Sequence, residues 1–152
     1  MNDTVVARPC WTVLAKKAED KVSLIQNEMV QARQRLESLH NSQQRIQKMY
    51  DEYRDGLTKS DAQSVGMREA MNQRQFMSQL LSLMQRVKTD IQYTENAIIG
   101  IKEQLIVQER ERIKMQTLAD QNAMAVRKDL NKREQKKMDE MGVMQFNLRP
   151  QH

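Results

Sequence analysis

The sequence is poor in the residues that interrupt helices. No proline lies between Pro9 and Pro150, and the 152 residues hold only four glycines. Sheets and α/β folds need many turns, which draw on proline and glycine. The six aromatic residues, 4% of the chain, are too few for the core of a compact globule of this length. These absences exclude a β-sandwich and a doubly wound α/β fold, and they leave long helices.

Cysteine and long apolar runs are scarce as well. Cys10 is the single cysteine, so a disulfide framework is excluded, and no cluster of Cys and His has the spacing of a metal site. The first nine residues lack the basic and apolar regions of a secretory signal. No apolar run approaches the ~20 residues that span a bilayer. We therefore expect a soluble cytoplasmic protein without cofactor or metal.

What the chain does contain is a repeating apolar stripe. Lys and Arg number 25 against 20 Asp and Glu, a formal charge of +5, and methionine is abundant at 12. Steps of four and three residues meet apolar side chains at 13 of 14 positions, with Gln43 as the exception. This period of 3.5 residues is typical of supercoiled helices. The positions are Trp11, Ala15, Ala18, Val22, Ile25, Met29, Ala32, Leu36, Leu39, Gln43, Ile46, Tyr50, Tyr53 and Leu57.

A second stripe follows a short segment rich in turn residues. Residues 55–66 contain two glycines, and Ser64 is placed to cap a helix that begins near Met67. Nine of the eleven positions in the second stripe are apolar. They are Ala70, Gln73, Met77, Leu80, Met84, Val87, Ile91, Thr94, Ile98, Ile101 and Leu105.

Two stripes joined by a turn predict an all-α fold, a two-helix antiparallel coiled-coil hairpin with a longer second helix. We expect one domain, with helix one at about 11–55, a turn at about 56–66, helix two at about 67–141 and a disordered tail at 142–152. A turn centred near Asp61 would make the numbers of facing residues sum to about 122 and set Trp11 opposite Glu111. Residues from about 112 onward would then lack a partner helix.

Catalytic sites are not indicated. The sequence contains no phosphate-binding glycine loop, nucleophile elbow or zinc helix motif. His40 falls on a predicted helix and His152 in the predicted tail, so both are expected to be solvated side chains. A non-enzymatic binding protein is the better interpretation.

A basic stretch near the end of helix two is one candidate binding surface. It contains Arg127, Lys128, Lys132, Arg133, Lys136 and Lys137, against Asp129 and Glu134. Lys128, Lys132 and Lys136 share a helix face because they lie four residues apart. Three interpretations remain open: a solvated face, a contact for an acidic protein, and a nucleic-acid contact. The last is disfavoured by the modest net charge and the lack of aromatics there.

The predicted turn offers a second candidate surface. Tyr50, Tyr53 and Phe76 are half of the aromatic residues, and the hairpin brings them together. The first two lie on the stripe and suit core packing. Met49, Phe76 and Leu83 lie off it and could form an exposed apolar patch.

Two short motifs in this layout resemble the FliJ family, a soluble component of the flagellar type III export apparatus. They are Tyr50-Asp51-Glu52-Tyr53-Arg54 before the turn and Gln135-Lys136-Lys137-Met138-Asp139-Glu140 near the end. The resemblance implies a non-enzymatic central stalk that activates the export ATPase ring, contacts the cytoplasmic domain of the export gate and escorts export chaperones. It also implies a cytoplasmic location at the flagellar base, with membrane association only through the export apparatus.

The resemblance further assigns two sets of contact residues. The ATPase ring would meet the basic stretch and the tail motif: Arg127, Lys128, Lys132, Arg133, Gln135, Lys136, Lys137, Asp139 and Glu140. The export gate would meet residues that flank the turn: Ile46, Met49, Tyr53, Phe76, Leu80 and Leu83. Met49 and Leu83 depart from the family pattern, in which an aromatic and a smaller residue are expected.

The residues also fit two other kinds of protein. A self-associating scaffold would bury the unpartnered part of helix two against a second copy. A basic-helix nucleic-acid-binding protein would use residues 127–137 and lose its affinity steeply with salt.

Overall fold

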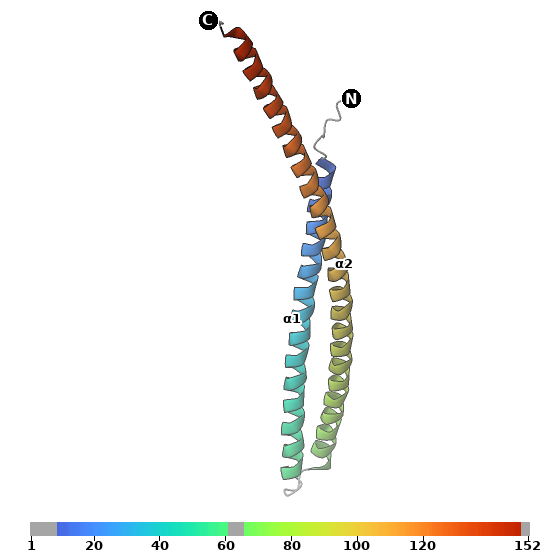
Figure 1. Ribbon diagram of the computed structural model, residues 1–152. Helices are drawn as coiled ribbons and strands as arrows, with labels where there is room; N and C mark the ends of the chain where they lie inside the picture. Colours follow the sequence, from blue (N-terminus) through green and yellow to red (C-terminus); the bar gives the residue numbers. More distant parts are fainter. Residues whose placement is uncertain (1–8, 61–65, 150–152) are drawn as a thin grey trace. The chain divides into compact units, whose positions relative to one another are not determined.

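Two long helices make up the described part of the chain. The computed structural model describes residues 9–60 and 66–149, and within them all but Gly66 and Arg149 are helical. Helix α1 is Pro9–Ser60 and helix α2 is Met67–Leu148 (Figure 1). The two pack as an antiparallel hairpin, which confirms the predicted all-α fold class and the longer second helix.

Both helices extend further than we predicted from the positions of the glycines. Helix α1 continues past residue 55 to Ser60, and α2 continues through Gly142 to Leu148, so residues 142–148 are not part of a disordered tail. A glycine inside a helix costs only about 1 kcal/mol relative to alanine. Near the end of α1, the hydroxyl of Thr58 is satisfied within the helix, since its Oγ1 donates to the carbonyl of Arg54 at 2.7 Å. A single glycine therefore does not end a helix that lacks proline.

The connection is shorter than predicted, which changes the register. Tyr53 and Phe76, whose rings are in contact across the two helices, have numbers that sum to 129 instead of about 122. The position opposite Trp11 moves accordingly from Glu111 to about Leu118. At the start of α2 the carbonyl of Gly66 accepts from the amides of Glu69 and Ala70 at 3.0 and 3.2 Å. The proposed turn centre Asp61 and cap Ser64 lie outside the described residues.

The burial pattern follows the predicted stripes. On α1, every stripe position except Tyr53 is buried or half-buried, and on α2 all eleven positions are. The periodicity continues past Leu105, where Gln108, Arg112, Met115, Ala119 and Asn122 are all half-buried although the stripe turns polar. The 3.5-residue seam is therefore confirmed as the packing surface.

The chain divides into two compact units. One unit, Leu24–Leu105, contains the connection and a core of four buried residues, Ile46, Leu80, Val87 and Ile91. Five partly buried residues pack against that core: Leu36, Leu39, Tyr50, Phe76 and Met84. Aliphatic and aromatic side chains at alternating four- and three-residue steps interdigitate in this way when two helices cross at a small angle.

The other unit comprises Met1–Ser23 and Ile106–His152. Ala15, Ala18 and Val22 are its buried residues on α1. On α2, Arg112 occupies a seam position and donates from Nε to Glu109 Oε1 at 3.0 Å. That hydrogen bond and the charge of Glu109 raise the pKa of Arg112, and the carboxylate of Glu19 on α1 adds to the effect. A charge at the seam is therefore held by carboxylates on both helices.

The seam predicts that the same substitution at two neighbouring isoleucines has very different effects on the free energy of unfolding. Ile98 is 8% exposed and Ile99 is 56% exposed. Ile98→Asp should lower the free energy of unfolding by several kcal/mol, because it buries a carboxylate without a partner. Ile99→Asp is the matched control and should leave the thermal midpoint nearly unchanged. Ile25→Asp, at a half-buried seam position, should also destabilise. Equal midpoints for the Ile98 and Ile99 variants in circular dichroism would refute the seam assignment.

A substitution at Gly100 can test whether the two helices approach each other closely at this small residue. A methyl group built at Gly100 meets nothing within 4 Å, and the residue is exposed. Gly100→Ala should therefore stabilise the hairpin by about 0.5–1 kcal/mol, through the lower conformational entropy of the unfolded chain. The measurement is urea unfolding followed by helical ellipticity. A lower midpoint would mean that the glycine serves a close contact instead.

Candidate functional site

The residues predicted to face the export gate divide into two groups. Ile46 and Leu80 are 8% and 5% exposed, so their side chains lie inside the hairpin and are not available for direct contact. Met49, Tyr53 and Leu83 are 41–43% exposed. Phe76 is half-buried and packs on Tyr53, with ring centroids 4.7 Å apart and planes tilted by 45°. We call Met49, Tyr53, Phe76 and Leu83 the tip patch.

Helix geometry explains why the tip patch is partly outside the seam. Met49 and Tyr53 lie four residues apart on α1, and Phe76 and Leu83 lie seven apart on α2, so each pair shares a face. The Tyr53–Phe76 contact joins the two helices at the edge of the seam. Sequence reasoning placed Tyr53 on the seam. Its exposed ring instead extends the apolar surface outward from the packed core.

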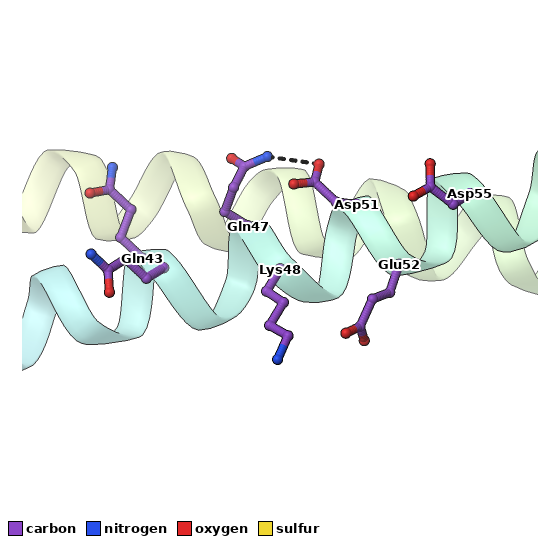
Figure 2. Close-up of a pocket in the computed structure, with 7 residues that line it drawn as sticks. Gln43, Gln47, Lys48, Asp51, Glu52 and Asp55 are labelled. Carbon is purple, nitrogen blue, oxygen red and sulfur yellow. Dashed lines mark hydrogen bonds between the residues drawn. The ribbon is translucent and has the colours of Figure 1, made fainter.

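A polar groove runs along α1 beside the Tyr-Asp-Glu-Tyr-Arg motif (Figure 2). Gln47 Nε2 donates to Asp51 Oδ1 at 3.1 Å, and Arg54 lies 3.7 Å from the same carboxylate oxygen. These contacts stay within one helix and involve exposed side chains, so they support the helix rather than hold a ligand. The lining residues are Gln43, Gln44, Gln47, Lys48, Asp51, Glu52 and Asp55.

Gln73 is a residue whose role the sequence pattern did not reveal. It holds a seam position on α2 and lines a small groove with Glu52, Tyr53, Gly56 and Leu57. Its Oε1 is buried and has no hydrogen-bond partner among the described residues. A buried acceptor left without a donor costs about 1–3 kcal/mol. The sequence signal was the interruption of an apolar stripe by an amide, next to the tip patch.

The predicted ATPase-binding residues are exposed along the last part of α2. All six cations of residues 127–137 are exposed, as are Gln135, Asp139 and Glu140. Arg133 pairs with Asp129 at 3.3 Å, and Gln135 donates to Asp139 at 3.5 Å. Within the described residues the four lysines form no ion pair, so their charges are directed at solvent. The structure thus brings this set together on one continuous helical segment.

Beyond the basic stretch lies an apolar segment that sequence reasoning treated mainly as a tail. Every residue from position 130 to position 149 is exposed, so no described part of the chain covers them. Six apolar side chains lie in residues 138–148: Met138, Met141, Val143, Met144, Phe146 and Leu148. The high proportion of apolar residues in this segment was the available signal. The assumption that Gly142 ends the helix concealed it.

The described residues contain no group of three or more His, Cys, Asp or Glu side chains placed to hold a metal ion. Cys10 is free and exposed. Neither described helix has an apolar stretch long enough to cross a bilayer. The arrangement supports binding through exposed surfaces, an apolar one near the connection and a basic one followed by an apolar one near the end of α2.

Comparison with known proteins identifies the family. No curated protein and no solved structure matches the chain. A family model described as Flagellar FliJ protein matches residues 12–151, which includes nearly all of both helices and both motifs. The chain therefore belongs to the FliJ family of flagellar proteins.

Proposed function

We propose that this FliJ-family protein is the central stalk of the flagellar export ATPase ring and activates ATP hydrolysis. Membership in the family supports a role in flagellar protein export without catalysis by the chain itself. The observation that carries the finer proposal is the exposed basic segment of α2. Six cations stand on a helix that no described residue covers, which suits a contact with an acidic protein surface.

The ring contact would use residues 127–140. The cations Arg127, Lys128, Lys132, Arg133, Lys136 and Lys137 supply long-range attraction, and Gln135, Asp139 and Glu140 supply directional hydrogen bonds. Charged surfaces of this kind accelerate association and orient the partner more than they add to affinity. A stalk that activates an enzyme needs such an orientation, because the ring must recognise one end of the protein.

The gate contact would use the tip patch. Exposed Met49, Tyr53 and Leu83 supply apolar area, and the Tyr53–Phe76 contact holds the two aromatic rings in place. Ile46 and Leu80 would act as positioning residues because they are buried beneath. Aromatic side chains with a polar tip are frequent among residues that dominate binding energy. Escort of export chaperones and a cytoplasmic location at the flagellar base complete the proposal.

The basic segment can be tested without disturbing the fold. Lys132→Glu, Arg133→Glu, Lys136→Glu and Lys137→Glu together should abolish stimulation of the cognate export ATPase. The thermal midpoint should barely change, because exposed charges contribute about 0–1 kcal/mol each. A matched control reverses four other exposed cations, Arg33, Arg35, Lys88 and Lys102. Both variants change the formal charge from +5 by eight, to −3.

The two variants separate a specific contact from a general charge effect. Stimulation of the export ATPase should be lost only in the first variant. The weak binding to the ATPase that this variant retains should depend little on salt. Full stimulation by the first variant would show that the basic segment is a solvated face. Equal loss in both variants would indicate that net charge alone matters. Retention of DNA on the unaltered protein at physiological salt would favour nucleic-acid binding instead.

The tip patch yields a second test. Met49→Gln with Leu83→Gln should weaken binding to the cytoplasmic domain of the export gate by about tenfold or more, since two apolar side chains lose their burial in the complex. Leu81→Gln with Val30→Gln is the control, because these residues are 49% and 53% exposed and lie outside the patch. Calorimetric titration measures both. Equal weakening by the control pair would remove the patch from the gate contact.

A further inference from the structure

One side of the last part of α2 carries a stripe that no described residue covers. Its positions follow steps of four, three, four, three and four residues, the same 3.5-residue period as the seam. At about 100° per residue, all six lie within about 80° of one another around the helix. The four apolar members are 53–80% exposed. We call these positions the terminal stripe: Leu130, Glu134, Lys137, Met141, Met144 and Leu148.

The opposite side of the same helix has a different character. Val143 and Phe146 point about 140° and about 160° away from the middle of the terminal stripe, and Lys132 and Asp139 lie among them. A helix that concentrates its apolar residues on one side, with charges on the other, fits a partner that covers one side only. Another helix with the same period is such a partner.

The terminal stripe is complementary to a second copy of itself in the antiparallel direction. When two helices run antiparallel, the numbers of the residues that face each other have a constant sum. The numbers 130 and 148, 134 and 144, and 137 and 141 all sum to 278. In this register Leu130 of one copy faces Leu148 of the other, and each of the other four positions faces a stripe position as well. A contact of this kind is isologous, because both copies use the same surface.

The distribution of charge favours antiparallel over parallel pairing. Residues 127–137 carry six cations and two carboxylates, whereas residues 138–148 carry Asp139 and Glu140 and no cation. Parallel pairing would place one basic half beside the other, and like charges repel. Antiparallel pairing places each basic half beside the half without cations. It also brings Lys137 of one copy to about the level of Glu140 of the other.

A groove on the basic half supplies a recess for the second copy. Its lining residues are Leu130, Arg133, Glu134, Lys136, Lys137 and Glu140. In the antiparallel register, the side chains that reach it are Met141 and Met144 of the second copy. Methionine is unbranched and flexible, so it fills irregular recesses. The aliphatic stem of Lys137 lies along apolar surface while its charge stays in water.

We propose that two copies of the chain pair reversibly and antiparallel through the terminal stripe, about a two-fold axis near position 139. The contact runs for about 27 Å at helix rise. Permanent dimers use larger and more hydrophobic interfaces, so this pairing depends on concentration. Because the terminal stripe overlaps residues 127–140, pairing withholds them from the ATPase ring, a consequence that rests on the proposed function.

The two sides of the helix supply matched variants. Met141→Gln with Met144→Gln alters the terminal stripe, and Val143→Gln with Phe146→Gln alters the opposite side. Sedimentation equilibrium of the full-length chains measures the Kd of the dimer, and circular dichroism verifies the helical signal. The stripe pair should raise the Kd by about tenfold or more, since four side chains per dimer lose their burial. The control pair should leave it unchanged.

Three results would overturn the pairing. One is an unaltered chain that remains monomeric at about 1 mM, a concentration at which even a weak dimer forms. The second is an equal effect of the stripe pair and the control pair on the Kd. The third is a stripe pair that weakens binding to the cognate ATPase without changing the mass, which would assign the terminal stripe to the ring alone.

Cysteine substitutions test the direction of pairing. Leu130→Cys and Leu148→Cys are made as separate variants with Cys10→Ser, because Cys10 is free and exposed. After oxidation, antiparallel pairing predicts a disulfide-linked dimer when the two variants are mixed and little when either is alone, since only facing residues come close enough to bond. Linkage of each variant to itself, or no linkage where the mass shows dimers, would overturn the antiparallel register.

The linked dimer also separates this inference from the proposed function. It should not stimulate the cognate export ATPase, and reduction of the disulfide should restore stimulation. Equal stimulation before and after reduction would overturn the withholding and leave the pairing standing. An unaltered chain that never stimulates the ATPase overturns the proposed function, whereas the mass and the cross-links decide the pairing by themselves.

Discussion

The narrow seam between α1 and α2 is the constraint on which the rest of the structure depends. Only two positions in seven face the other helix, so the buried core consists of nine apolar residues and Thr94 among the described residues. None of the described large side chains is less than 2% exposed. A core this thin leaves most side chains of both helices facing outward. The outward-facing side chains are therefore where recognition has to occur.

Polar residues within the seam show how little tolerance such a core has for polar groups without hydrogen-bond partners. Thr94 is 3% exposed and satisfies its hydroxyl by donating to the carbonyl of Asp90 at 2.8 Å. Arg112 donates a hydrogen bond to Glu109, and this hydrogen bond lowers the pKa of Glu109. Gln73 alone leaves a buried oxygen without a described partner. The least satisfied seam position thus lies beside Tyr53, where the packed core gives way to the tip patch.

The sequence was sufficient to predict the seam but not to predict where the two helices end. Residues such as Val87, Ile91 and Ile98 repeat at a period that only one kind of packing satisfies, so the fold class and the buried positions could be predicted. Where a helix ends depends on the sum of small free-energy contributions from individual residues. Gly56 and Gly142 each cost about 1 kcal/mol, which the neighbouring helix-forming residues offset. Counting the glycines as stops moved the register by about seven and assigned residues 142–148 to a tail.

The candidate site was predictable in part for a related reason. Spacing groups Met49 with Tyr53 and shows that the six cations of residues 127–137 are near one another. It does not determine how far a side chain at the edge of the seam is covered, which depends on the crossing of the two helices. The resemblance assigned Ile46 and Leu80 to the gate contact although they are buried, and the stripe favoured core packing for Tyr53 although the residue is 41% exposed.

The end of α2 is where stability and function depend on each other most directly. From position 130 to position 149 every residue is exposed, so this segment gains no tertiary packing from the described chain. Most helical stability in proteins comes from tertiary packing, which this segment lacks. It is maintained because it continues a packed helix and therefore avoids the cost of nucleation. A partner that covered part of it would supply the missing burial, and binding would then stabilise the helix as well as recognise it.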